Sequence, residues 1–235
     1  MTHTTNQQQN LQTLLTEAKT VVLSTHRQCD GDGLGAELAL RHSLVSAGKM
    51  AQVIQVDSTP KKYRFLEPEK WIQNFEVDQK LPEQIDLFLI LDTNDERLLS
   101  PLFAEIQKRS KHTAFIDHHP ILKKGPKPTA ESWIDLTAAS TGEMAYRLIH
   151  GANLPIDREV ARCIYTSITF DTQLYRFVRN SAVSHRIAAD MIDFGIDTES
   201  IHRHLFGHHT IQKVSYLGKA LGQIEYSADG QIAFL

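Results

Sequence analysis

The sequence has few cysteines, little net charge and no long apolar run. Its two cysteines, Cys29 and Cys163, are too few for a disulfide framework, so both are expected as reduced thiols. No apolar run approaches the roughly 20 residues that span a bilayer, and residues 1–10 lack the features of a secretory signal. These absences predict a cytoplasmic protein with no membrane partner. The net charge of −3 gives no general attraction for nucleic acid, so a phosphate-bearing substrate needs a local binding device.

The chain of 235 residues, 41% of them hydrophobic, is long enough for one large domain with a real core. An amphipathic helix is expected where Leu34, Leu38 and Val45 recur at near-helical spacing. Apolar runs bounded by polar or turn residues alternate with such segments, which predicts an α/β fold with a mostly parallel sheet flanked by helices. The runs expected to form strands are residues 20–26, 50–57, 86–92 and 112–119.

After about residue 137 the strand patterns stop and helical patterns follow. A Ser/Thr-x-x-Glu pattern opens the first helix, and Gly151 and Gly195 close two of them. The last residues, 227–235, read as a turn followed by a strand without a partner, which suggests the beginning of something longer. The expected helices are residues 140–152, 158–174, 181–195 and 198–206, followed by a long segment at 210–226.

Asp30 and Asp32 lie among three glycines where the first strand gives way to a helix. The glycines could form a dinucleotide cradle, with Asp57 as the ribose-binding acid, but their spacing is G-x-G-x-G rather than G-x-G-x-x-G. Two carboxylates in the loop would also repel a pyrophosphate unless a cation lay between them. If a divalent metal ion is bound by these carboxylates, the same loop becomes a binding site for a phosphate.

Further acidic and imidazole groups stand at the ends of other elements. A single aspartate at a helix start is usually a cap, but four clusters at successive element ends favour a metal site. Residues beyond the carboxyl ends of parallel strands converge on a common crevice, so these side chains are expected to meet. They are His26, Asp30, Asp32, Asp92, His118, His119 and Asp171.

Four segments carry a resemblance to a known family. In chain order, HRQCDGDGLGAELAL, LDTNDERLL, IDHHP and FDTQLYRF resemble the four motifs of the DHH phosphoesterases, and Asp117-His118-His119 is the signature triplet. The chain most resembles the bacterial oligoribonuclease and 3′-phosphoadenosine-phosphate phosphatase subgroup, the nanoRNases, over nearly its whole length. Cys29 stands where the family usually has proline.

The resemblance implies a two-metal site. Oxygen and imidazole ligands without thiolate suit Mn²⁺, two ions per protomer, with Mg²⁺ or Co²⁺ as alternatives. Such a pair of ions can activate water and brace an in-line attack on phosphorus. The implied catalytic residues are His119, which faces the phosphate, and Asp117, which orients a neighbouring imidazole. One ion would be held by His26, Asp30 and Asp92, and the other by Asp32, Asp92, His118 and Asp171.

The expected function is an Mn²⁺-dependent phosphoesterase acting on short oligonucleotides, linear dinucleotides or 3′-phosphoadenosine 5′-phosphate. Arg97 and Arg176, each five residues past a predicted metal ligand, are candidate phosphate contacts. The alternatives are a nucleotide-binding or regulatory DHH module without turnover, and an inorganic pyrophosphatase of family II. The sequence leaves open whether the protein forms a homodimer.

The resemblance also predicts the domain organisation. Residues 1–207 are expected to form the DHH domain. Residues 208–235 are expected to form a linker helix and the first strand of a DHH-associated C-terminal domain, the remainder of which is missing from the sequence. Such a domain carries part of the substrate site in the family, so its absence would weaken substrate binding.

Overall fold

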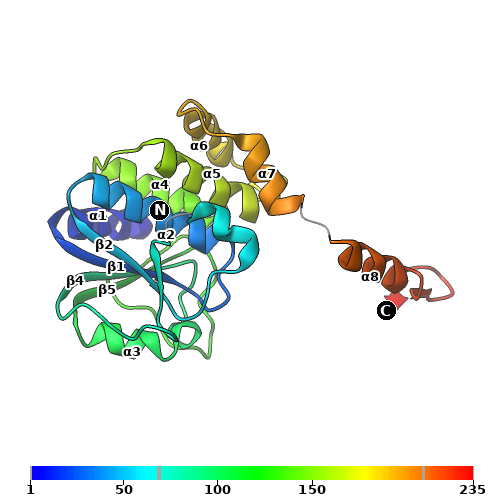
Figure 1. Cartoon of the computed structure of the whole chain (residues 1–235), viewed down its shortest axis with the longest axis horizontal. Helices are drawn as coiled ribbons and strands as arrows, with labels where there is room; N and C mark the ends of the chain where they lie inside the picture. The colour runs from blue at the N-terminus through cyan, green and yellow to red at the C-terminus, as the bar shows by residue number, and fades with distance from the viewer. Residues whose placement is uncertain (1, 68–69, 208–209, 235) are drawn as a thin grey trace.

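A six-stranded parallel sheet forms the centre of the molecule, in the order β3-β2-β1-β4-β5-β6 (Figure 1). The computed structural model describes residues 2–67, 70–207 and 210–234. The four predicted strands are confirmed, although the second and the fourth each end two residues earlier than expected. Two short edge strands, β3 and β6, escaped prediction because two or three residues carry no readable pattern. The strands are β1 (Thr20–Thr25), β2 (Met50–Gln55), β3 (Ile72–Asn74), β4 (Ile85–Leu91), β5 (Ser110–Asp117) and β6 (Trp133–Ile134).

Helices cover both faces of this sheet, which confirms the predicted α/β class. Figure 1 shows α1, α2, α4 and α5 on one face and α3 on the other. Two 3₁₀ helices, η1 (Lys61–Leu66) and η2 (Glu96–Leu99), lie in the connections. The α-helices are α1 (Thr2–Glu17), α2 (Gly31–Ser46), α3 (Leu102–Gln107), α4 (Thr141–Gly151), α5 (Arg158–Asp171), α6 (Val183–Ile192), α7 (Thr198–Phe206) and α8 (Ile211–Leu221).

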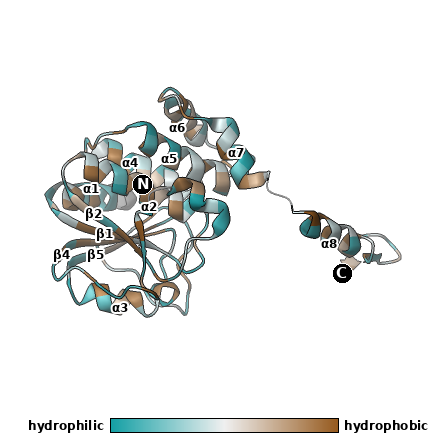
Figure 2. Cartoon of the chain, viewed as in Figure 1, coloured by the Kyte–Doolittle hydropathy of each residue, from teal (hydrophilic) through white to brown (hydrophobic). Residues whose placement is uncertain are grey.

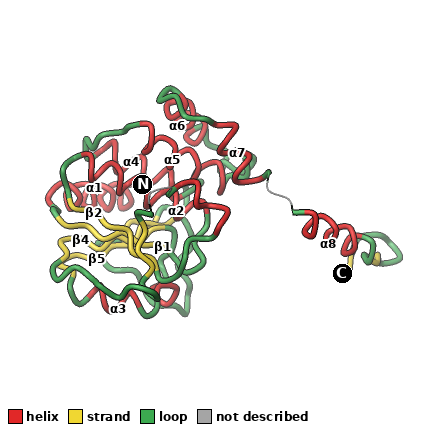
Figure 3. Tube along the Cα trace, viewed as in Figure 1, coloured by secondary structure: helices red, strands yellow, loops and turns green. Residues whose placement is uncertain are grey.

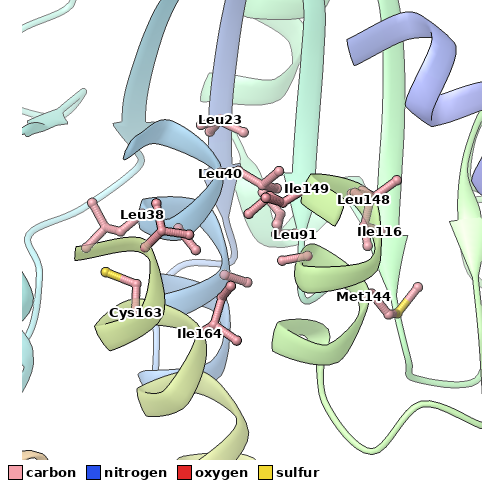
Figure 4. Packing of buried hydrophobic residues seen from close by; sticks show 14 of the residues in the cluster. Leu23, Leu38, Leu40, Leu91, Ile116, Met144, Leu148, Ile149, Cys163 and Ile164 are labelled. Atoms are coloured by element: carbon pink, nitrogen blue, oxygen red, sulfur yellow. The ribbon is translucent and has the colours of Figure 1, made fainter. Parts of the chain in front are cut away.

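The core is divided by the sheet into two clusters. Val21 and Leu23 belong to one cluster and Val22 to the other, because successive strand residues face opposite sides. Figure 2 shows the apolar residues gathered along the central strands. The larger cluster lies under α2, α4 and α5, where Figure 4 shows their side chains meeting those of the strands. Helices therefore cover both faces of the sheet, and a site is expected at the ends of its strands.

Helix α2 differs from its prediction. An amphipathic helix was expected, but nearly every residue from Gly31 to Leu44 is buried, including Leu34 and Leu38, while Val45 is exposed. The reason is that α2 lies between the sheet and α5, so it has no broad solvent-facing side. Gly35 lies close against α5: a Cβ there would be 2.7 Å from the carbonyl oxygen of Cys163.

The C-terminal segment also differs in detail. The helical segment expected at 210–226 ends at Leu221 in α8, and the final strand has a partner after all: β8 (Ala233–Phe234) pairs antiparallel with β7 (Glu225–Tyr226). Figures 1 and 3 show α8 and this hairpin apart from the α/β body. The predicted boundary between residues 207 and 208 adjoins residues 208–209, which lie outside the described residues. Among the described residues, no helix is long and apolar enough to cross a membrane.

Candidate metal centre

The candidate metal centre lies at the carboxyl ends of three neighbouring strands. His26 and Asp30 follow β1, Asp92 follows β4, and the Asp117-His118-His119 triplet closes β5. Because β1, β4 and β5 are adjacent and parallel, these segments meet at one edge of the sheet. Two helices complete the site, since Asp32 lies in the first turn of α2 and Asp171 is the last residue of α5.

The first group of donor atoms comes from His26, Asp30 and Asp92. One ligand atom from each lies within 4.8 Å of the other two. Nε2 of His26 is 3.6 Å from a carboxylate oxygen of Asp92. Asp30 caps α2 by accepting hydrogen bonds from the backbone N–H groups of Asp32 and Gly33, at 2.9 and 3.3 Å. The usual role of an aspartate at a helix start is therefore present as well, and it fixes the carboxylate beside the group.

The second group is formed by Asp32, His118 and Asp171, again with ligand atoms within 4.8 Å of one another. Nε2 of His118 lies 3.5 Å from Asp32, 3.5 Å from Asp171 and 3.7 Å from Asp92. This buried nitrogen has no hydrogen-bond partner among the described residues. Bonds of about 2.1 Å to one ion place neighbouring ligand atoms roughly 3 to 3.5 Å apart. The arrangement therefore fits a divalent cation better than it fits a hydrogen-bonded cluster.

The carboxylates of this centre are crowded, and burial together with their mutual repulsion outweighs the positive charges near them. Burial and the charge of Asp171 raise the pKa of Asp32 to about 8. Burial, followed by the charges of Asp32 and Asp30, raises the pKa of Asp92 well above its ordinary value. Burial and the charge of Asp30 raise the pKa of Asp171 to about 6. A divalent cation would remove these penalties by favouring the ionised carboxylates, so the electrostatics also fit a metal.

The start of α4 holds two of these carboxylates in place. Asp32 accepts hydrogen bonds from the backbone N–H groups of Thr141 at 2.8 Å and Gly142 at 3.1 Å, and from the Ser167 hydroxyl. The Thr141 hydroxyl donates to Asp92 at 3.0 Å. Sequence reasoning missed Thr141 and Ser167 as site residues. The capping pattern did predict a helix start at this point, but nothing in it indicated that the helix points at the metal centre.

Asp117 is fully buried and holds the second histidine of the triplet. Its Oδ1 accepts a hydrogen bond from Nδ1 of His119 at 2.8 Å, which raises the pKa of His119. Asn94, which sequence reasoning also missed, donates to Asp117 at 2.6 Å and to the carbonyl oxygen of His119 at 3.1 Å. The His119 side chain is 54% exposed, whereas that of His118 is 3% exposed. His119 is therefore accessible to a substrate.

The sequence model of the N-terminal domain of the DHH family matches residues 20–168. The chain belongs to the DHH family. It is 27% identical over 177 residues to the bifunctional oligoribonuclease and PAP phosphatase NrnA of Thermus thermophilus, covering 75% of this chain and 50% of that protein. An uncharacterised protein of Mycoplasma genitalium is 30% identical over 117 residues, covering 49% of this chain and 34% of that protein.

Two solved structures share the fold. A crystal structure of an exopolyphosphatase-related protein from Bacteroides fragilis superposes with a TM-score of 0.84 at 23% identity, over 96% of this chain and 67% of that one. A proposed family II inorganic pyrophosphatase from Methanococcus jannaschii gives a TM-score of 0.56 at 13% identity, over 79% and 60% of the two chains. The predicted family is confirmed by the family model, and these structures show the shared fold. The chain spans half or less of the length of the curated relatives it matches.

The two arginines expected to contact phosphate lie in different surroundings in this DHH protein. Arg97 is paired with Asp95 at 2.5 Å, and its side chain is 60% exposed. Arg176 instead lines a cavity beside Asp171, together with Arg179, which sequence reasoning missed. The structure thus brings Arg176 to the edge of the candidate metal centre, whereas Arg97 is engaged by a neighbouring carboxylate.

Proposed function

We propose that the protein is a divalent-metal-dependent phosphoesterase. Its proposed substrates are short oligonucleotides, linear dinucleotides or 3′-phosphoadenosine 5′-phosphate, cleaved at phosphodiester or phosphomonoester bonds. The observation that carries this proposal is the convergence of carboxylate and imidazole donors into three overlapping groups around Asp92 and His118. These groups are His26, Asp30 and Asp92; Asp32, His118 and Asp171; and Asp92, Asp117, His118 and His119. The likeness to NrnA, named as an oligoribonuclease and PAP phosphatase, supports the substrate class.

The donor set suits two ions of a hard divalent metal. Carboxylate oxygens with some imidazole and no thiolate favour Mn²⁺, with Mg²⁺ or Co²⁺ as alternatives. Bound ions would supply Lewis-acid stabilisation of the phosphate and activation of water. In this proposal the first ion is held by His26, Asp30 and Asp92, and the second by Asp32, Asp92, His118 and Asp171.

The chain's own groups position the substrate and move a proton. His119 is exposed at the cleft, and its hydrogen bond to Asp117 favours the protonated imidazole. A protonated His119 can donate a hydrogen bond to a phosphate oxygen and a proton to the leaving oxygen. Asp117, held by Asn94, fixes the orientation of this ring, so in the proposal it acts through His119 and not on the substrate directly.

The shape of the cleft favours an organic ester over inorganic pyrophosphate. The cleft, of about 370 Å³, is lined by the apolar residues Leu98, Pro120 and Leu122 as well as by Asp92 and His119. Leu98 and Leu122 are 47% and 55% exposed, so a substrate could cover them. A ribose or base would bury the apolar surface of these side chains and so favour binding, whereas pyrophosphate has no apolar surface to bury against them. The likeness to the pyrophosphatase structure supports the shared fold alone.

The test is a substrate panel with a matched variant. The purified chain with Mn²⁺ is given pApA, 3′-phosphoadenosine 5′-phosphate and inorganic pyrophosphate. Asp92→Asn is the informative change, because Asp92 has φ +62° and asparagine tolerates this left-handed backbone. Removing a shared ligand should lower kcat/KM by more than the roughly 10- to 100-fold typical of outer-shell changes. Asp86→Asn is the control, since Asp86 lies near the other end of β4, about 20 Å away.

Three outcomes would contradict the proposal. Turnover of pyrophosphate without turnover of either nucleotide would assign an inorganic pyrophosphatase. Nucleotide binding without turnover in any divalent metal would indicate a regulatory module. Equal loss of activity in Asp92→Asn and Asp86→Asn would show that the effect is not specific to the metal centre. The cytoplasmic location remains a prediction of the sequence, and the oligomeric state stays open.

A further inference from the structure

A second cavity opens beside the metal centre. Its volume is about 510 Å³, and Asp171 lines both this cavity and the cleft that contains His119. The two hollows therefore meet at Asp171, the last residue of α5. Most of the cavity wall comes from the loop that follows this helix, and its lining residues are Ala139, Asp171, Arg176, Phe177, Val178, Arg179 and Asn180.

The cavity carries two arginines whose charges are not neutralised by ion pairs. Neither the Arg176 nor the Arg179 guanidinium makes an ion pair or hydrogen bond within the described part of the chain; that of Arg176 lies 5.6 Å from the ring centre of Phe177. Arg27, by contrast, is paired with a carboxylate. The Arg179 charge also acts on the metal centre, because it lowers the pKa of Asp171 and of His118. Guanidinium groups that share a concave surface form a binding site for a phosphate.

The loop that presents these arginines has an unusual backbone. Arg179 and Asn180 both have φ +53°, and Gln173, Leu174 and Tyr175 are also left-handed. Such residues cost roughly 1 kcal/mol or more each and persist only where the surroundings enforce them. Here the Thr172 hydroxyl accepts a hydrogen bond from the backbone N–H of Tyr175 at 3.0 Å, and the Tyr175 hydroxyl is 2.9 Å from that of Thr169. The loop is thereby anchored to α5, which also carries Asp171.

We propose that the cavity binds a second, non-scissile phosphate of the substrate through Arg176 and Arg179. The inference rests on the proposed function and narrows it. With the scissile phosphate at the metal centre, a substrate that carries another phosphate on its far side would place it in this cavity. The favoured class is therefore a dinucleotide with a terminal phosphate, or a nucleoside with two phosphates, over an ester with a single phosphate.

The test compares the binding of pApA with that of ApA, which lacks the terminal phosphate. Binding is measured by calorimetry in a chelator, which prevents metal-dependent turnover. Both probes carry the same internal phosphate, so repulsion between that phosphate and the carboxylates of the metal centre affects both equally. The wild-type chain should bind pApA at least about 10-fold more tightly than ApA, as expected for charge-assisted hydrogen bonds. Arg179→Gln and Arg176→Gln should each reduce this ratio several-fold, and the double variant should bring it near one.

The variants have matched controls. Gln173 adopts φ +49° in the same loop, so glutamine at position 179 is compatible with its backbone. Arg179→Lys retains the charge and should keep part of the preference for pApA. Arg158→Gln should leave the preference unchanged, because Arg158 opens α5 and lies about 20 Å from Asp171 at the opposite end of the helix.

The outcomes separate this inference from the proposed function. Equal dissociation constants for pApA and ApA in the wild-type chain would overturn the phosphate site, whether or not the protein hydrolyses either probe. An equal loss of affinity for both probes in Arg179→Gln would also overturn it, since that result indicates a disturbed loop. A clear preference for pApA without turnover in Mn²⁺ would leave the phosphate site standing and remove the proposed hydrolysis.

Discussion

Asp92 shows how a single backbone conformation shapes the site. It leaves β4 in the left-handed region, and its backbone N–H still donates to the carbonyl oxygen of Ile116 at 2.9 Å. Aspartate and asparagine tolerate this region better than other residues with a side chain. The turn lets a residue at the strand end direct its carboxylate to both donor groups, so the residue type meets a backbone requirement as well as a chemical one.

His42 on α2 gives a prediction for the pH dependence of folding. Its side chain is buried, its ring centre lies 4.4 Å from that of Trp71, and burial together with Arg41 lowers its pKa to about 4. The unfolded imidazole has a pKa near 6.5, so between about pH 6.5 and pH 4 the unfolded chain binds the proton more readily. The free energy of unfolding should therefore fall as the pH is lowered through this window.

His42→Phe removes this titration while it keeps a ring against Trp71. The slope of the free energy of unfolding against pH should become shallower than in the wild-type chain, by at most about 1.4 kcal/mol per pH unit. Urea denaturation at several pH values between 7 and 4 measures the slopes. Parallel curves for the two proteins would show that His42 does not carry a proton-linked penalty.

Single residues also mark the limit of what the sequence can tell. His26, Asp92 and Asp171 could be found because their chemistry is unusual at the ends of apolar runs. Thr141, Ser167 and Asn94 could not, because hydroxyls and amides are common and only their contacts with Asp32 and Asp117 give them a role. The ligand assignments themselves remain predictions, since they await a measurement of bound metal.

At the scale of elements, the contact between α2 and α5 decides the spacing of the site. Gly35 allows the close approach, because a Cβ there would lie 2.7 Å from the Cys163 carbonyl oxygen and 2.8 Å from the Ser167 side chain. The same two helices carry Asp32 and Asp171, so any increase in their separation also moves two proposed ligands apart.

Gly35→Ala should therefore weaken both folding and metal binding. Overpacking of this kind typically costs about 1 to 3 kcal/mol, and the affinity for Mn²⁺ should fall because the two ligand-bearing helices separate. Urea denaturation in chelator measures the first effect, and titration with Mn²⁺ measures the second. Gly218→Ala is the control: a Cβ there meets nothing within 4 Å, so it should be neutral or slightly stabilising. Equal behaviour of the two variants would refute the packing argument.

Elements differ in how well their sequence patterns predict them. Strands β1, β4 and β5 were predictable because strands buried on both sides read as continuous apolar runs. Helix α1 was missed, since its Gln/Asn-rich start hides the two fully buried leucines, Leu11 and Leu15, that attach it to the core. Helix α2 was recognised, but its burial on nearly all sides was not, because that burial comes from neighbours that are distant in sequence.

At the scale of the whole molecule, the parallel order of the sheet explains why motifs spread from residue 26 to residue 119 share one site. The carboxyl ends of adjacent parallel strands lie at one edge, and that rule was sufficient to predict the convergence. The cavity beside Asp171 was beyond such a rule. It depends on the left-handed path of the loop after α5, and no sequence pattern specifies left-handed residues other than glycine at those positions.

The segment after residue 207 provides the last prediction. None of the described residues of α8 is buried, and apolar side chains such as Ile211 and Leu217 are 86% and 56% exposed. Because the segment shares so little surface with the α/β body, its removal should cost the body almost no free energy of unfolding. A chain of residues 1–207 should melt within about 2 °C of the full chain in chelator, where roughly 1 kcal/mol corresponds to a few degrees. It should also bind Mn²⁺ with the same stoichiometry. A loss of more than about 5 °C would mean that α8 packs on the body in solution, and the predicted boundary between residues 207 and 208 would then be wrong.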